Sequence, residues 1–381
     1  QLTGGTNRNS TTLPKMKLAV LLIALIAIVA AISTLEPVRE PKRLIAFSDT
    51  DRRWLKPSTI DRLRWNNTFF VDITDYPDFS LDNPPQSVNF ADFPSGPLNK
   101  EEVENLISKI DIKNVEDIVT HLSTAFPNRK YNTQSGRESA LWIFEEMKRI
   151  AGGNSDIDVR LFEHSFGVQP SVIATIAGKG NLAGEHVIIG GHEDSTAFGN
   201  TAPGADDGTG SATVMEVFRI FVENVATGSS NRRTLEFQTY AAEEVGLRGS
   251  GAIAADYKAR MVNVYAMLQF DMTGYRAPND AFMSPITDYT SPTLTQFMRE
   301  MIDAYCDAPR LDSTCGYGCS DHASFHNNGF PAVFTFEAPF RSSNPNIHTA
   351  RDTVDKLTWS WAHEFVKLGV GAMYELAVFE G

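Results

Sequence analysis

The chain has 381 residues, of which 42% are hydrophobic and 21% are charged, so it can bury one large core and is neither disordered nor membrane-filling in composition. Its formal net charge of -13 argues against a surface that binds nucleic acid or anionic membranes, and favours the binding of cations. The three cysteines are too few for a disulfide scaffold, so stability has to come from a hydrophobic core.

An apolar run at residues 18–32 follows Lys15, Met16 and Lys17. A membrane-spanning helix needs about 20 apolar residues, and this run is shorter, so it is typical of a signal peptide over residues 16–34. An uncleaved membrane anchor is the alternative. We interpret residues 1–15 as upstream or added sequence outside the fold. We therefore expect a secreted, extracellular protein without stable membrane association.

Residues 35–97 are rich in Pro, Asp and Arg, with isolated aromatic clusters and no long period. This composition indicates a propeptide-like segment ahead of the main domain, which we expect over residues 98–381. Asn66 begins a sequon with Asn67 and Thr68, which would allow glycosylation in the secretory pathway.

Helical periodicity follows the Pro-Ser-Gly-Pro stretch at 94–97. It covers residues 100–112, 114–125, 135–150 and, further on, 208–225. Apolar runs that favour β-strands lie at 171–176, 186–191, 234–241 and 264–270. Strands alternating with helices predict an α/β sheet with helices on both faces. Ligands of such sheets bind at the carboxyl ends of the strands.

Histidines and carboxylates stand where the predicted strands stop, or in the loops that follow them. They are His192, Asp194, Asp206, Asp207, Glu243, Glu244, Asp271 and, near the end of the chain, His348. Two imidazoles and three carboxylates make a plausible dinuclear zinc site. Two metals about 3.5 to 4 Å apart can clamp the attacking and leaving oxygens of a hydrolysis. The pattern indicates peptidase or esterase chemistry.

The adjacent Glu243 and Glu244 can point to different places, so one can bind metal while the other remains a general base. A solvated charge pair is the alternative, which the preceding apolar strand disfavours. His322 could be a ligand, a donor to a ligand or a core histidine. The remaining histidines have no pattern of acidic partners, and we interpret them as structural: His121, His164, His186, His326 and His363.

Cys315 and Cys319 enclose Gly-Tyr-Gly. A zinc knuckle is disfavoured, because three residues separate the cysteines and no second pair exists. In an oxidising compartment a disulfide between them is favoured. It would hold a loop that presents Tyr317.

Six motifs in order resemble those of the M28 family of zinc peptidases, specifically the secreted leucine aminopeptidases of bacteria and fungi. They are GGHEDST, APGADDGTG, AAEEVGLRGS, QFDMTGY, CGYGCSDHASFH and NPNIHTARDT, and the resemblance runs from about Lys100 to the C-terminus. It implies the zinc-dependent exopeptidase fold, a three-layer α/β/α sandwich around a mixed, largely parallel β-sheet. It also implies two Zn²⁺ per chain and peptide substrates with a free N-terminus, cleaved after large apolar residues such as Leu.

The resemblance also implies roles for single residues. Asp206 would bridge both metals, with His192 and Asp271 completing one site and Glu244 and His348 the other. Glu243 would be the general base. Relatives often carry three acidic residues after Pro-Gly-Ala where this chain has two, so Asp207 is the alternative bridging ligand.

Two further roles concern groups beside the metals. Asp194 would orient the imidazole of the first ligand, and Tyr317 would stabilise the developing oxyanion. Five apolar residues correspond to pocket positions of similar enzymes, although each could equally be core packing: Met272, Phe334, Phe336, Phe340 and Ile347.

The segment 43–78 resembles the removable propeptide of fungal relatives and would cover the site or assist folding. Two alternatives keep the same scaffold. A carboxypeptidase or glutaminyl cyclase would need a basic patch or an altered metal set, whereas a non-catalytic receptor-like ectodomain would have lost metal ligands. By analogy with similar enzymes we expect a monomer.

Overall fold

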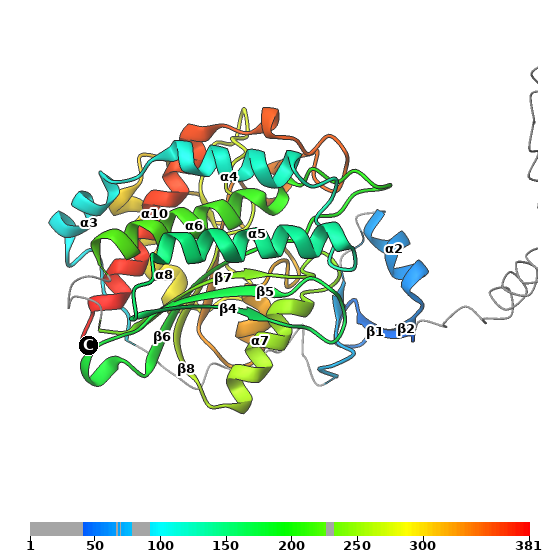
Figure 1. Cartoon of the computed structure of the whole chain (residues 1–381), viewed down its shortest axis with the longest axis horizontal. Helices are drawn as coiled ribbons and strands as arrows, with labels where there is room; N and C mark the ends of the chain where they lie inside the picture. The colour runs from blue at the N-terminus through cyan, green and yellow to red at the C-terminus, as the bar shows by residue number, and fades with distance from the viewer. Residues whose placement is uncertain (1–40, 66–67, 69, 78–91, 226–231) are drawn as a thin grey trace, which may run out of the picture. The chain divides into compact units, whose positions relative to one another are not determined.

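A seven-stranded sheet organises the computed structural model (Figure 1), which describes residues 41–65, 68, 70–77, 92–225 and 232–381. The strand order is β4-β5-β7-β6-β8-β10-β9. The strands are β4 (Ile157–Phe162), β5 (Ser171–Ile176), β6 (Glu185–His192), β7 (Thr234–Tyr240), β8 (Asn263–Gln269), β9 (Ser284–Pro285) and β10 (Ala332–Phe336). The inner strands β7, β6, β8 and β10 run parallel, and the outer pairings are antiparallel.

Helices cover both faces of this sheet (Figure 1). One face is covered by α3 (Lys100–Ile107), α4 (Ile112–Thr124), α5 (Gln134–Ala151), α6 (Ala205–Asn224), α8 (Pro292–Tyr305) and α10 (Trp359–Val378), and the other by α7 (Arg248–Ala259) and α9 (His322–Asn327). Val187 and Ile189 pack into the first core, whereas Ile188 packs into the second. Because successive strand residues face opposite sides, inner strands buried on both sides read as continuous apolar runs. The predicted α/β fold is confirmed.

Local capping explains one difference from the predicted elements. The helix expected over 100–112 ends at Ile107, and α4 begins at Ile112. The side chain of Asp111 accepts a hydrogen bond from the main-chain N–H of Lys113 at 3.0 Å, so it caps a new helix instead of continuing the first.

The propeptide-like segment contains a small antiparallel sheet of order β2-β1-β3. Its elements are β1 (Arg43–Ala46), β2 (Arg52–Leu55), α2 (Pro57–Trp65) and β3 (Val71–Asp72). Ala46, Val71 and Ile73 share a buried cluster with Leu247 and Ala323. Residues from Arg43 to Gly381 accordingly form one compact unit.

Phe93 lies N-terminal to the expected start of the main domain, yet its ring packs 5.2 Å from that of Tyr265. The main core therefore includes residues before 98. The predicted signal peptide and Asn66 lie outside the described residues. Within the described part, no helix combines the length and apolar character needed to cross a membrane.

Candidate active site

The carboxyl ends of three neighbouring parallel strands converge on one cavity of about 240 Å³. His192 is the last residue of β6, Glu243 and Glu244 follow β7, and Asp271 follows β8. Asp206 joins them from the first turn of α6, and His348 from the loop after β10. All six side chains line the cavity, as expected for ligands at the strand ends of an α/β sheet.

Two triads of possible metal ligands share Asp206. In one, Nε2 of His192 lies 3.3 Å from Oδ1 of Asp206 and 3.6 Å from Oδ1 of Asp271. In the other, Nε2 of His348 lies 3.5 Å from Oδ2 of Asp206 and 3.0 Å from Oε2 of Glu244. Each triad offers one ligand atom per residue, all within 4.8 Å of one another. One carboxylate thus presents an oxygen to each triad.

Asp207 has a different environment. Its Oδ1 accepts the main-chain N–H groups of Gly210 at 2.6 Å and Met272 at 2.9 Å, and its Oδ2 accepts that of His192 at 3.1 Å. These bonds use its lone pairs to join α6, β6 and the loop after β8, and it belongs to neither triad. The geometry therefore favours Asp206 as the shared ligand.

Asp194 fastens the loop that carries the two glutamates. It accepts the main-chain N–H of Glu243 at 2.9 Å and of Glu244 at 3.3 Å. Nδ1 of His192 lies 3.2 Å from the Asp194 carbonyl oxygen and 3.5 Å from its Oδ1. Asp194 therefore lies beside the imidazole with both its carbonyl and its carboxylate, and it also holds the glutamate loop, which the sequence analysis did not predict.

The crowded carboxylates shift the pKa values of the site. Burial alone would lower the pKa of His192, but Asp271 and Glu243 outweigh it and hold this pKa well above 6.5. For His348 burial is likewise outweighed by Glu244, which raises the pKa to about 9. The pKa of Glu243 is raised well above 4.5, chiefly by burial. A raised pKa makes a carboxylate a stronger base.

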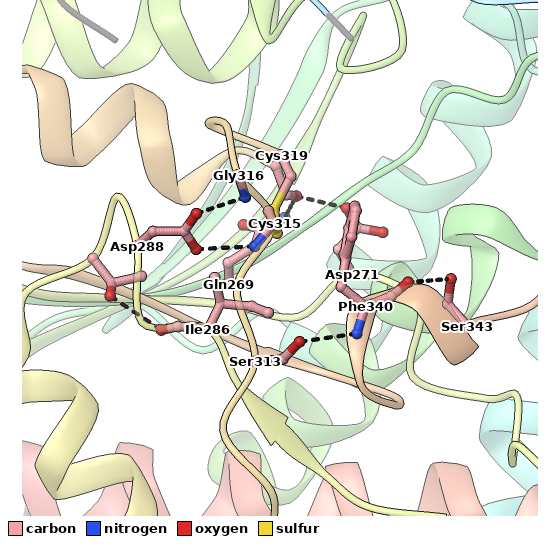
Figure 2. The surroundings of a disulfide bond; sticks show 12 residues. Gln269, Asp271, Ile286, Asp288, Ser313, Cys315, Gly316, Cys319, Phe340 and Ser343 are labelled. Atoms are coloured by element: carbon pink, nitrogen blue, oxygen red, sulfur yellow. Dashed lines mark hydrogen bonds between the residues drawn. A yellow bond between two sulfur atoms is a disulfide. The ribbon is translucent and has the colours of Figure 1, made fainter. Parts of the chain in front are cut away.

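The predicted disulfide between Cys315 and Cys319 is present, and Figure 2 shows its surroundings. The side chain of Asp288 accepts the main-chain N–H of Cys315 at 3.0 Å and of Gly316 at 2.6 Å. Tyr317, between the cysteines, lines the cavity. Burial and the nearby carboxylates raise its pKa well above 10, so its hydroxyl stays a hydrogen-bond donor.

The apolar wall of the cavity contains all five residues predicted for the pocket: Met272, Phe334, Phe336, Phe340 and Ile347. Thr68 and Phe70, from the propeptide-like segment, also line the cavity. The sequence analysis did not place these two residues there, and only the general expectation that the segment covers the site pointed to them.

His322 is fully buried and stacks on Phe334 with ring centroids 5.1 Å apart. Burial lowers its pKa to about 3, and it belongs to neither triad.

Two histidines expected to lack acidic partners have them. His186 meets Glu236 of the neighbouring strand β7, and His363 lies 4.0 Å from Glu364 beside it in α10.

The ligand atoms that the two triads offer are of the kinds that bind metal ions. Imidazole nitrogens and carboxylate oxygens are the ligands that zinc prefers in hydrolases. Oδ1 of Asp271 and Oε1 of Glu244 are buried and have no hydrogen-bond partner among the described residues. A cation bound at each triad would satisfy these oxygens, since buried polar atoms without a partner carry a free-energy cost.

Known proteins share this architecture. The model of peptidase family M28 matches residues 171–372. Leucine aminopeptidase 1 of Neurospora crassa is 37% identical, over 90% of this chain and 87% of that protein; its namesake in Coccidioides posadasii is 36% identical, over 89% and 90%. The crystal structure of the LapA aminopeptidase of Legionella pneumophila is 28% identical with a TM-score of 0.79, covering 90% of this chain and 100% of that one. The predicted resemblance is confirmed: the chain belongs to peptidase family M28.

Proposed function

We propose that the protein is a two-zinc aminopeptidase that hydrolyses the N-terminal peptide bond of peptides. The observation that carries this proposal is the position of Asp206, because each of its two carboxylate oxygens faces a different triad. Glu243 lies beside the triads and belongs to neither. Paired ligand sets with a shared carboxylate are suited to clamping both oxygens of a hydrolysis. The names of the M28 relatives support the same activity.

When bound, zinc supplies Lewis acidity that polarises the scissile carbonyl and lowers the pKa of the attacking water. Glu243, which belongs to neither triad, lies with Oε2 4.0 Å from Nε2 of His192. It takes the proton of the water and later gives it to the leaving amine. Tyr317 donates its hydroxyl hydrogen to the carbonyl oxygen as negative charge develops there.

Charge in the cavity supports recognition of an amino end rather than a carboxyl end. Four carboxylates, Asp206, Glu243, Glu244 and Asp271, line the cavity, and its described lining contains no Lys or Arg. The proposed zinc ions would offset the charge of these carboxylates, but the described lining offers no cationic side chain to pair with a substrate carboxylate. This balance disfavours a carboxypeptidase, and the complete ligand set disfavours a receptor-like ectodomain.

The wall formed by Phe334, Phe336 and Ile347 supports a preference for large apolar side chains such as Leu. One methylene in such a pocket is worth about 1 to 3 kcal/mol, so we expect graded selectivity. We further propose that the protein is secreted and monomeric. The disulfide supports secretion, since such bonds persist in oxidising compartments.

We also propose that residues 43–77 form a propeptide that narrows the cavity. Thr68 and Phe70 line that cavity. The main-chain N–H of Asp72 donates to the carbonyl of Gly246 at 3.3 Å, two residues after Glu244. The segment therefore contacts the turn that follows Glu243 and Glu244.

Hydrolysis of leucine p-nitroanilide tests the proposed activity. We expect activity in the wild type, its loss on zinc chelation, recovery with zinc, and a loss of at least about 100-fold in Glu243→Gln. N-acetyl-leucine p-nitroanilide is the matched control, because its amino group is blocked. Equal hydrolysis of both substrates, or full activity after zinc removal, would rule the proposal out.

A further inference from the structure

Arg129 is a fully buried cation in the segment between α4 and α5. Its guanidinium donates only to main-chain carbonyls. Nε donates to Glu193 at 2.9 Å, Nη1 to Pro203 at 2.8 Å and Leu122 at 3.3 Å, and Nη2 to Gly204 at 2.7 Å. Among the described residues it forms no ion pair within 4.0 Å, so the groups in direct contact with its charge are main-chain carbonyls.

Three of these carbonyls lie beside two of the three ligands in the triad that contains His192. Glu193 directly follows the ligand His192, and Pro203 and Gly204 stand just before the ligand Asp206. The planar guanidinium, with several donors in fixed directions, thus joins the end of β6 to the start of α6. Gly204 has φ +61°, and a Cβ there would lie 2.9 Å from an Arg129 nitrogen. A residue with a side chain at position 204 would therefore clash with the guanidinium.

A second contact ties Arg129 to the same loop. Its main-chain N–H donates to Oγ of Ser195 at 3.0 Å, and the Ser195 hydroxyl donates to the carbonyl of Ala202 at 3.0 Å. Both ends of the loop 193–204 are therefore held by one residue. None of the Arg129 hydrogen bonds described above involves an atom of the two triads.

We propose that Arg129 is a positioning residue for the metal ligands: it sets the distance between His192 and Asp206 by holding the loop ends beside them. This inference rests on the proposed zinc enzyme. The buried positive charge also offsets part of the negative charge of Asp194, Asp206, Asp207 and Asp352, whose fields all act on it. A rigid scaffold behind the ligands lowers the entropy lost when an ion binds.

Zinc binding by the full chain of Arg129→Lys tests this role. Lysine keeps the charge but has a single nitrogen, which cannot reach all four carbonyls. We expect a cooperatively folded protein whose zinc dissociation constant, from competition with a fluorescent chelator, rises by about 10- to 100-fold. Wild-type affinity in this variant would overturn the inference. Failure of the wild type to bind zinc would instead overturn the proposed function.

Arg233→Lys is the matched control. Arg233 is 3% exposed and also donates to a main-chain carbonyl, that of Leu376 at 2.9 Å, but it precedes β7 at the opposite end of the strands. We expect a lower melting temperature and unchanged zinc affinity, and an equal loss of affinity would overturn the inference. If Arg129→Lys does not fold, Ser195→Ala provides a milder change, and we expect zinc affinity at least threefold weaker; unchanged affinity would again count against the role.

Discussion

Asp194 accepts the main-chain N–H of Glu243 at 2.9 Å, which links the end of β6 to the loop after β7. The same carboxylate accepts the N–H of Glu244 at 3.3 Å. A single side chain thereby orients both the proposed base and a proposed ligand, because each side chain leaves a backbone that Asp194 holds.

Asp194→Asn tests this link. An amide presents one accepting oxygen and turns its NH₂ group towards the other N–H, so one of the two bonds is lost. We expect kcat for leucine p-nitroanilide to fall by about 10- to 100-fold, with a smaller change in KM. Asp158→Asn, at an exposed position of β4, is the control. A kcat within twofold of wild type would contradict the role.

Tyr317→Phe removes a hydroxyl but keeps the ring, which lies 6.0 Å from that of Phe340. Loss of one oxyanion donor costs about 100-fold or more in kcat, and we expect such a loss with little change in KM. Steady-state kinetics measure both constants. Tyr275→Phe, outside the cavity lining, should be nearly neutral. A mainly raised KM would assign Tyr317 to substrate binding instead.

Asp72→Ala tests whether residues 43–77 cover the cavity. Asp72 is buried and lies 2.7 Å from Nε of Arg43 and 3.8 Å from Nε of Arg248. Removing it leaves both cations without this carboxylate, which costs about 3 to 5 kcal/mol for a buried pair. We expect weaker docking of the segment and a several-fold rise in kcat/KM.

Asp75→Ala is the control for that change, because Asp75 also pairs with Arg43 but its side chain is 54% exposed. A second test inserts a protease site within residues 78–91 of the otherwise unchanged chain. Cleavage at that site should raise the rate of leucine p-nitroanilide hydrolysis. A lower melting temperature of Asp72→Ala without any gain in rate would support the folding role of the segment and contradict the covering role.

Glu364 predicts a defined pH dependence of stability. Burial would raise its pKa, but the nearby His363 and hydrogen bonds from Lys367 and the Asp307 main chain outweigh this and lower the pKa from 4.5 to about 2. A depressed acid stabilises the fold above its unfolded pKa, and this contribution disappears as pH falls through the folded value. We therefore expect Glu364→Gln to be less stable than wild type at pH 7, by up to about 3 kcal/mol.

Urea unfolding at a series of pH values checks this expectation. The difference between wild type and Glu364→Gln should be constant above pH 5 and shrink between pH 4.5 and 2. Glu300→Gln, on the exposed face of α8, should show no such difference. A difference that grows on acidification would mean that the sign of the linkage is wrong.

Structural features that depend on residues close together in the sequence were predicted best. β5 has the predicted bounds, because its apolar run is bordered by a proline and an Ala-Gly pair. Four of the six residues at the cavity, His192, Glu243, Glu244 and Asp271, were found because strand ends of a parallel sheet meet at one edge. Asp206 and Asp207 could not be separated by counting, since the difference lies in which carboxylate faces main-chain N–H groups.

Contacts between distant segments escaped prediction. Thr68 and Phe70 reach a cavity built from residues after 190, and no local period encodes such a contact. Glu236 meets His186 only because β6 and β7 are paired in register. Arg129 belongs to no recognisable motif. Its proposed role depends on the main-chain carbonyls that point towards its guanidinium, and a sequence does not show where carbonyls point.

The carboxylate of Asp206 belongs to both triads, so the two proposed ion positions would form one thermodynamic unit. An ion at either position changes the charge and orientation that Asp206 offers to the other, and the resulting coupling free energy has to be the same in both directions. Zinc uptake should therefore not follow the curve of two independent sites. A substitution confined to one triad, such as a change at His348, should alter the affinity of the triad that contains His192.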